Sequence, residues 1–373
     1  MRIVVLTTSY PVTPGDFRGA FVADLNDALA RMGHSVRTVT PTPAGALFRK
    51  HGALDALKAE PWRALELPVA LGGLAAEAAW ALRDAGLLIS HWMLPCGVVA
   101  AALSALTGKP HILVEHGGSL RLLPRSRPAA RLLAFCLGNA TVAHFVSPAL
   151  KMDALSRLTT RERVELEERC SVLPMPPAPA PTVRSRTYAP PLRVLFAGRL
   201  DPSKGVDLLL QAVARTRFCR LTIAGSGPLA ATLQPAVQRA GIEDRVDIVG
   251  LVPHNHLPEL MSRHDVLVVP SLAPSPAHAA LAEGTPAVLL EGMASGLVPV
   301  VSDVGGMAAW VRNGRNGLVF AQADVAALAA HLRFLSSNPR AAARLAAAAL
   351  ATAATCTHPR LVQTWAQHIP HLA

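Results

Sequence analysis

The chain has 373 residues, a formal charge of +11 and five cysteines, and these numbers exclude several classes of protein. Its length predicts two domains rather than one core. Apolar residues make up 51% of the sequence, yet no uninterrupted run of about 20 indicates a membrane-spanning helix. The apolar start at residues 1–6 is too short for a signal peptide, so we expect a cytoplasmic protein.

The positive charge is shared about equally between the two halves of the chain, and aromatic residues make up only 4%. A nucleic-acid binder more often concentrates its charge in one stripe with interleaved aromatic residues, so we expect no nucleic-acid partner. A nucleotide diphosphate or an anionic membrane surface fits this charge better. The scattered cysteines lack the short paired spacing of a zinc site, and we expect buried thiols.

Short apolar runs alternate with segments of helical period along the first half of the chain. After the first run, Phe21, Leu25, Ala28 and Leu29 fall on one face of a helix. This alternation predicts an α/β fold, with a parallel sheet covered by helices on both sides. The expected strands are Ile3–Leu6, Val36–Val39, Leu87–Ser90, His111–Val114 and Thr141–Phe145.

Seven prolines gather in residues 174–191, which is typical of a semi-rigid linker. We therefore expect two Rossmann-like domains, residues 1–180 and 181–355, facing each other across a deep cleft. A last helix in residues 356–373 is expected to pack back on the first domain. Expected strands beyond the linker are Arg193–Phe196, Arg220–Ala224, Val246–Val249, Val266–Val269 and Val298–Val301.

The strongest chemical pattern is a pair of glutamates, Glu283 and Glu291, separated by seven residues. Thr285 is expected as the N-cap of a helix and Pro286 as its first residue, which places Glu283 outside the helix and Glu291 in its second turn. Free backbone N–H groups at such a helix start bind phosphate or sugar oxygens, and a carboxylate accepts hydrogen bonds from hydroxyls. Two arbitrary glutamates would more often mark only a solvated helix start.

The surroundings of this pair favour the functional interpretation. Residues 268–271 (VVPS) precede it, residues 293–306 (MASGLVPVVSDVGG) follow it, and residues 196–205 read FAGRLDPSKG. Together these segments resemble the retaining GT-B glycosyltransferases of family four. The resemblance covers nearly the whole chain and is strongest in residues 192–320. Further matching segments are residues 223–228, 249–253, 315–319, 33–36 and 10–21.

The resemblance implies roles for individual residues. Arg199 and Lys204 would hold the diphosphate of a nucleotide sugar, because negative charge builds on that group as the glycosidic bond breaks. Glu283 would orient the sugar, Glu291 would bind the nucleotide ribose and His116 would contact the transferred sugar. The implied catalytic residues are His116, Glu283, Arg199 and Lys204, and the implied donor-binding residues are Gly19, Arg199, Lys204, Gly225, Leu251, Gly284, Thr285 and Glu291.

The implied reaction moves a sugar from a UDP- or GDP-sugar to a hydroxyl of a glycan, lipid-linked or small-molecule acceptor, with retention of configuration. The expected setting is cell-surface polysaccharide or lipopolysaccharide biosynthesis, with no metal or other cofactor. A dinucleotide-dependent oxidoreductase would need a complete glycine fingerprint, and the Gly225-x-Gly227 pair lacks the third glycine. A catalytically silent GT-B scaffold remains an alternative, although it would be expected to lose Arg199, Lys204 or one glutamate.

Two further patterns remain open. His91 and His116 each follow an expected strand, and a structural role is the alternative for both. Residues 121–133 place four arginines beside leucines, which indicates either contact with an anionic membrane near a lipid-linked acceptor or a solvated basic helix. Met307 and Ser119 stand where the family usually has a glutamate and an aspartate.

Overall fold

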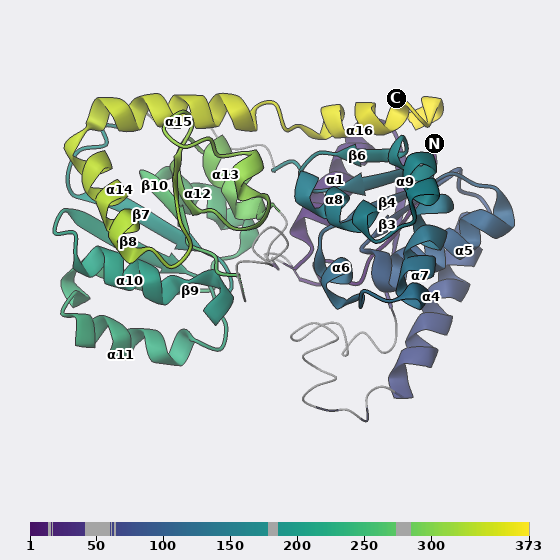
Figure 1. Cartoon of the computed structure of the whole chain (residues 1–373), viewed down its shortest axis with the longest axis horizontal. Helices are drawn as coiled ribbons and strands as arrows, with labels where there is room; N and C mark the ends of the chain where they lie inside the picture. The colour runs from purple at the N-terminus through teal and green to yellow at the C-terminus, as the bar shows by residue number, and fades with distance from the viewer. Residues whose placement is uncertain are drawn as a thin grey trace. The chain divides into compact units, whose positions relative to one another are not determined.

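The structure is a computed structural model that describes residues 1–13, 16, 18–41, 60, 62, 65–177, 186–273 and 285–372 (Figure 1). Contacts divide it into two compact units. Unit 1 comprises Met1–Val12, Arg18–Pro174 and His358–Ala373, and unit 2 comprises Thr13–Phe17 and Met175–Thr357. Each unit holds one six-stranded sheet in which every neighbouring pair of strands is parallel. The expected α/β fold with two parallel sheets is therefore confirmed.

The sheet of unit 1 has the strand order β2-β1-β3-β4-β5-β6. The chain moves from β1 to β2 on one side and then crosses to β3 on the other side. The space between the carboxyl ends of β1 and β3 is thus a topological switch point, where ligands bind in open parallel sheets. The strands are β1 (Arg2–Leu6), β2 (Ser35–Val39), β3 (Leu87–His91), β4 (His111–Glu115), β5 (Val142–Phe145) and β6 (Cys170–Val172).

Helices cover this sheet and bury a core of aliphatic side chains. Leu74 and Leu82 of α4 pack with Val4 and Leu88 of the strands in one cluster. Trp365 of α16 is fully buried, and its ring centroid lies 5.5 Å from that of His144. The helices of unit 1 are α1 (Ala20–Arg31), α4 (Glu66–Leu82), α5 (Val98–Thr107), α6 (Gly118–Leu122), α7 (Arg127–Gly138), α8 (Pro148–Ser156), α9 (Thr160–Glu167) and α16 (His358–Ala366).

The sheet of unit 2 has the order β12-β11-β10-β7-β8-β9, so its topological switch point lies between β7 and β10. Its strands are β7 (Leu192–Ala197), β8 (Cys219–Ala224), β9 (Val246–Gly250), β10 (Val266–Val269), β11 (Val298–Ser302) and β12 (Leu318–Phe320). Its helices are α10 (Val206–Ala214), α11 (Ala230–Ala240), α12 (Leu257–Ser262), α13 (Ala287–Ala294), α14 (Val325–Ser337) and α15 (Pro339–Ala353).

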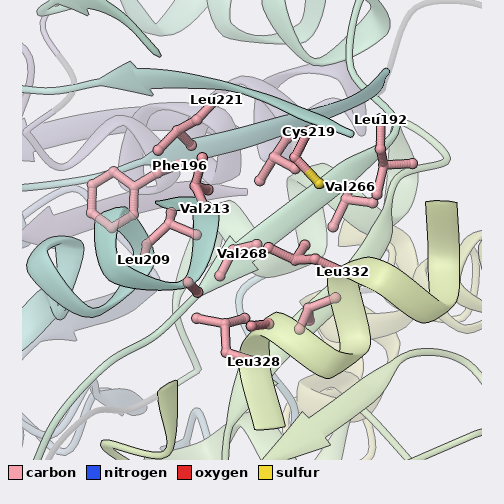
Figure 2. Close-up of a cluster of buried hydrophobic side chains, with 14 of the residues drawn as sticks. Leu192, Phe196, Leu209, Val213, Cys219, Leu221, Val266, Val268, Leu328 and Leu332 are labelled. Atoms are coloured by element: carbon pink, nitrogen blue, oxygen red, sulfur yellow. The ribbon is translucent and has the colours of Figure 1, made fainter. Parts of the chain in front are cut away.

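Alternate residues of the unit 2 strands face opposite helix layers, as expected for a buried parallel sheet. Val266 and Val268 belong to the cluster with α10, α11 and α14, whereas Leu267 and Val269 belong to the cluster with α12, α13 and α15. Figure 2 shows the first cluster, in which Leu209 of α10 and Leu328 of α14 approach the strands. The sheet is therefore covered on both faces, as the sequence predicts.

The start of helix α13 corrects one detail. Helix α13 begins at Ala287 with Pro286 as its N-cap, so the expectation of Thr285 as N-cap and Pro286 as the first helical residue is wrong by one position. Phe21 of α1 is only partly buried and packs against aromatic side chains rather than in the aliphatic core.

Among the described residues, no helix combines the length and apolar character needed to cross a membrane. Four of the five cysteines are buried and Cys170 is partly buried.

Candidate functional site

The loop after β7 carries the two expected diphosphate-binding cations of unit 2. It leaves the strand at Gly198, passes Arg199 and enters a short 3₁₀ helix, Pro202–Lys204, before α10 begins. Asp201 caps this 3₁₀ helix: its Oδ1 accepts hydrogen bonds from the Ser203 backbone N–H at 2.9 Å and from the Ser203 hydroxyl at 2.5 Å. Its Oδ2 lies 3.2 Å from Nε of Arg199. One carboxylate thus positions both the turn that presents Lys204 and the side chain of Arg199.

Glycines let the neighbouring loop pack directly against this backbone. A Cβ atom on Gly225, which follows β8, would lie 1.9 Å from the carbonyl oxygen of Gly198, and one on Gly227 would lie 2.4 Å from that of Leu200. Both glycines have φ near +155°, a conformation that other residues rarely adopt. The Leu200 N–H donates to the Ser226 carbonyl at 2.9 Å. Gly225 therefore supports the loop that carries Arg199.

A third glycine fixes the start of α10 beside the loop that follows β10. Gly205 has φ +66°, and a Cβ atom there would lie 2.0 Å from the carbonyl oxygen of Pro270. The Leu272 N–H donates to the Ser203 carbonyl at 2.7 Å. Because β7 and β10 are the strands of the switch point, Lys204 stands where this type of sheet binds ligands.

Three further expected donor-binding residues of unit 2, Leu251, Thr285 and Glu291, follow strands of its sheet along the chain. Leu251 follows β9 directly and is 55% exposed. Thr285 precedes α13 and Glu291 lies in the second turn of that helix. Glu283 and Gly284 lie outside the described residues.

In unit 1, Gly19 has a packing role of its own. It is the N-cap of α1 with φ +65°, and a Cβ atom there would lie 2.1 Å from the carbonyl oxygen of Ser9. Only glycine allows the start of α1 to approach the end of the β1 loop this closely. The geometry thus explains the residue type without requiring contact with a phosphate.

His116 lies in an aromatic cluster at the carboxyl ends of β3 and β4. Its ring lies nearly parallel to that of His91, with centroids 5.3 Å apart and planes 17° apart, and Nε2 of His116 lies 3.0 Å from Nδ1 of His91. Trp92 and Phe21 complete the cluster, with centroids 4.9 and 4.8 Å from that of His116. Trp92 has φ +64°, a conformation that is uncommon for a bulky residue and concentrates at functional sites.

A buried carboxylate holds the two loops that form this cluster. Glu115 accepts hydrogen bonds from the Met93 N–H at 2.9 Å and from the Gly117 N–H at 2.7 Å, and it also bonds Ser119. Ser119 in turn accepts a hydrogen bond from the Leu94 N–H at 3.0 Å. Burial raises the pKa of Glu115, while these hydrogen bonds act in the opposite direction. The serine that replaces the family's usual aspartate is thus part of the support for the His116 loop.

Both histidines of the cluster are held in the neutral form. Burial, with a smaller contribution from nearby His144, lowers the pKa of His91 to about 3. Burial, and then proximity to His91 and His144, hold the pKa of His116 well below its usual value. A neutral imidazole carries one N–H donor and one acceptor nitrogen, so the pair can form a single directed hydrogen bond.

The arginine-rich stretch of residues 121–133 forms part of a pocket of about 380 Å³ in unit 1. Arg125, Arg127 and Arg157 line it together with Ser126, Thr159 and neighbouring residues. All four arginines of the stretch are exposed, but Leu123 and Leu133 point into the core, and Leu122 is the exposed leucine, at 48%. The stretch is therefore a charged surface more than an apolar one.

Asp153 fixes two of the pocket's cations. Its carboxylate, which is 4% exposed, bonds the guanidinium groups of Arg125 at 2.5 Å and Arg157 at 2.7 Å. Among the pocket-lining residues, all of which are described, Arg127 provides a third positive charge at the start of α7, where Ser126 makes no side-chain cap hydrogen bond.

Comparison with known families agrees with this architecture. The model of a family described as glycosyl transferases group 1 matches residues 184–352, which form most of unit 2. The model described as glycosyltransferase family 4 matches residues 19–166, which lie in unit 1. The chain belongs to the family-four glycosyltransferases.

Curated relatives of this family match part of the chain. A glycogen synthase of Mycobacterium tuberculosis (strain H37Rv) is 35% identical over 173 residues, which are 45% of this chain and 40% of that protein. The alpha-D-kanosaminyltransferase of Streptomyces kanamyceticus is 30% identical over 41% of this chain and 38% of its own length. The amylovoran biosynthesis glycosyltransferase AmsK of Erwinia amylovora is 32% identical over 40% of this chain and 37% of its own length. The matches thus span about two fifths of each relative.

Solved structures share the fold over the full chain. Anabaena Alr3699/HepE in complex with UDP and glucose has a TM-score of 0.72 and 18% identity, with 100% of both chains covered. The sucrose-phosphate synthase (tll1590) from Thermosynechococcus elongatus has a TM-score of 0.73 and 20% identity, with 99% of both chains covered. At this level of identity the likeness establishes the GT-B fold of the family.

The structure therefore collects the expected residues at two sheet edges. Arg199, Lys204, Gly225, Leu251 and Glu291 belong to unit 2, and His116 and Gly19 belong to unit 1. Three supporting residues had no assigned role in the sequence: Asp201, Glu115 and Phe21. The Asp-Pro-Ser order is a signal for a cap at Asp201, whereas Glu115 could be suspected as a carboxylate that ends an otherwise apolar strand.

Proposed function

We propose that the protein is a retaining glycosyltransferase that transfers a sugar from a nucleotide-diphosphate sugar to an acceptor hydroxyl. The observation that carries the proposal is the β7 loop of unit 2. Its two cations, Arg199 and Lys204, are positioned by one Asp201 cap and by glycines that pack backbone against backbone. This arrangement lies at the topological switch point of a parallel sheet, where phosphate-bearing ligands bind.

In the proposed reaction, the bond between the anomeric carbon and the diphosphate oxygen breaks while the acceptor oxygen bonds to the same face of that carbon. The leaving phosphate takes the acceptor proton. Arg199 and Lys204 would stabilise the charge that grows on the diphosphate, because preorganised cations act most strongly on charge that develops in the transition state. These two side chains supply the positive charge, so we propose that no metal ion is needed.

Other residues would recognise the rest of the donor. Glu291 would accept hydrogen bonds from the ribose hydroxyls. Thr285 precedes α13, and Thr285 and Gly284 would contact sugar or phosphate oxygens. Glu283 would orient the sugar hydroxyls, and exposed Leu251 would pack against the nucleobase.

The comparisons support a choice of donor and setting. The Anabaena HepE structures were solved with UDP, with UDP and glucose, and with UDP-glucose. We therefore rank a UDP-sugar above a GDP-sugar. AmsK acts in amylovoran biosynthesis by name, so we propose that this protein takes part in making a cell-surface polysaccharide or lipopolysaccharide.

For the acceptor, we propose a glycan or a lipid-linked molecule presented at an anionic membrane surface. The exposed guanidinium groups of Arg121, Arg127 and Arg131 support this proposal, since basic side chains are attracted to anionic lipid headgroups. The protein would then work in the cytoplasm as a peripheral partner of the membrane.

The first test measures thermal stabilisation and slow hydrolysis with UDP-, GDP- and ADP-sugars, without added metal. Wild-type protein is compared with Lys204→Ala, Glu283→Ala and a matched control, Arg220→Ala. The exposed side chain of Arg220 lies at the amino end of β8, whereas the proposed donor site lies at the carboxyl ends of the strands. One nucleotide sugar should stabilise the wild type and Arg220→Ala and be hydrolysed by both, while the other two variants lose these responses.

If no nucleotide sugar stabilises the wild type, or if all four proteins respond alike, the proposed activity is wrong. A catalytically silent GT-B scaffold would then be the better account.

A further inference from the structure

The two neighbouring histidines of unit 1 differ in burial. His91 is fully buried, and its Nε2 has no hydrogen-bond partner among the described residues. His116 is partly exposed. Its Nε2 lies within hydrogen-bonding distance of Nδ1 of His91, at 3.0 Å. The rings are nearly parallel, at 17°. His91 is therefore the inner residue of the pair, and its hydrogen bond runs to the more exposed His116.

Two neutral imidazoles can share this hydrogen bond in two ways. In the first, Nδ1–H of His91 donates to a bare Nε2 of His116, which leaves the proton of His116 on Nδ1. In the second, Nε2–H of His116 donates to Nδ1 of His91, which forces the proton of His91 onto its buried Nε2. The second arrangement creates a buried N–H group without an acceptor.

Buried N–H groups without acceptors are rarer in folded proteins than acceptors with an unused lone pair. We infer that His91 is a positioning residue: its Nδ1–H donates to Nε2 of His116 and fixes His116 as a neutral imidazole that presents its Nδ1–H group to a substrate oxygen. His91 thus selects which nitrogen of His116 carries the proton.

This role deepens the proposed function and, for its consequence in catalysis, rests on it. With Nδ1 protonated and Nε2 already bonded to His91, His116 has no free lone pair with which to remove a proton from the acceptor hydroxyl. It can donate a hydrogen bond to a hydroxyl or phosphate oxygen of a bound sugar nucleotide. The acceptor proton must then leave by another route, which agrees with its proposed transfer to the departing phosphate.

The same protein supplies internal references for the tautomer. Nε2 of His144 lies 2.8 Å from the carbonyl oxygen of Leu173, which can only accept, so His144 must carry its proton on Nε2. By the same argument, His264 donates from Nδ1 to the carbonyl oxygen of Leu260 at 2.7 Å. His144 and His264 therefore show what the two tautomers look like in this chain.

The test is nitrogen NMR of the full-length protein with isotope-labelled histidine, near neutral pH and without ligand. His91 and His116 should each show a protonated Nδ1 and a bare Nε2, like His264 and opposite to His144. A protonated Nε2 on His116 overturns the inference. Because this measurement requires no activity, its outcome is independent of whether the protein transfers sugars.

Two variants that differ by one side-chain group extend the test. The amide of His91→Asn can donate an N–H to His116 or accept through its oxygen, so it permits either tautomer. The carboxylate of His91→Asp can only accept, so Nε2 of His116 should become protonated. A bare Nε2 of His116 in folded His91→Asp contradicts the inference.

If the first test identifies a hydrolysed donor, kinetics give a second readout. His91→Asp should lower kcat at least tenfold relative to His91→Asn with little change in the affinity for the free nucleotide, which binds unit 2. Equal kcat values in the two variants would show that the tautomer of His116 has no part in the reaction.

Discussion

The carbonyl oxygen of Gly198 occupies the place that a Cβ atom on Gly225 would need, because the two atoms would be 1.9 Å apart. Gly225→Ala should push the Gly198 peptide aside and move Arg199 with it. We expect nucleotide affinity to fall at least tenfold and the free energy of unfolding to fall by about 1–3 kcal/mol. Isothermal titration with the identified nucleotide, together with urea unfolding, measures both effects.

Gly241→Ala is the matched control for this prediction. Gly241 also has a positive φ, +63°, but a Cβ atom there would meet no atom within 4 Å. This variant should lose about 1 kcal/mol of stability and keep the nucleotide affinity of the wild type. Equal affinity losses in both variants would mean that Gly225 does not support the Arg199 loop.

The Asp201 cap offers a second way to disturb the same loop. Asp201→Ala removes the acceptor of the Ser203 N–H and the partner of Arg199, so we expect a loss of about 1 kcal/mol in stability and roughly fivefold in nucleotide affinity. Asp201→Asn keeps a good capping group and should recover the melting temperature. If Asp201→Ala binds nucleotide as tightly as the wild type, the cap does not position the cations.

The buried histidines make unit 1 sensitive to acid. Burial lowers the pKa of His144 to about 4, against about 6.5 when unfolded. Its contribution to stability is complete above pH 6.5 and is lost as pH falls toward 4, because the unfolded chain then binds a proton that the folded chain does not. The free energy of unfolding of the wild type should therefore fall by about 3 kcal/mol relative to that of His144→Gln between pH 6.5 and pH 4.

Melting temperatures at several pH values measure this change. Ser171→Ala removes the hydroxyl that bonds Nδ1 of His144 at 2.8 Å but leaves the histidine in place. The difference in melting temperature between Ser171→Ala and the wild type should therefore vary much less with pH. If the difference in melting temperature between the wild type and His144→Gln is the same at every pH, His144 is not held neutral in the folded protein.

The exposed arginines of residues 121–133 predict a charge-dependent membrane contact. Replacing Arg127 and Arg131 by glutamine should weaken binding to vesicles that contain anionic lipid by roughly tenfold or more, since each basic residue near the surface contributes about 1 kcal/mol. The control pair, Arg340 and Arg344 to glutamine, removes the same charge from exposed positions on α15. Equal losses in both pairs would indicate a non-specific charge effect, and no binding by the wild type would remove the membrane from the proposal.

The sequence predicts the central strands of both sheets well because buried parallel strands are mostly apolar. All ten expected strands are confirmed, and each end differs from the structure by at most one residue. The strands that were missed, β6 and β12, have three residues each and lie at sheet edges. Such short edge strands carry too little apolar pattern to stand out.

The sequence could predict which residues belong to the candidate site, but it could not predict which of them contact one another. Arg199 and Lys204 are cations next to a strand end, and the family resemblance points to them directly. The bond between His91 and His116 joins the last residue of β3 to the residue that follows β4, 25 positions apart. Only the pairing of β3 beside β4 brings the two together. The support that Gly225 gives to Gly198 depends in the same way on the pairing of β7 with β8.

The final helix α16 determines when unit 1 can be completed. Trp365 of that helix is fully buried in a unit whose other residues end at Pro174, whereas unit 2 lies almost entirely in Met175–Thr357. During synthesis, the ribosome thus completes nearly all of unit 2 before it reaches α16, whereas unit 1 lacks its buried tryptophan until α16 has been made. Domains usually fold in the order in which they are made, but here the first unit to be started is the last to close.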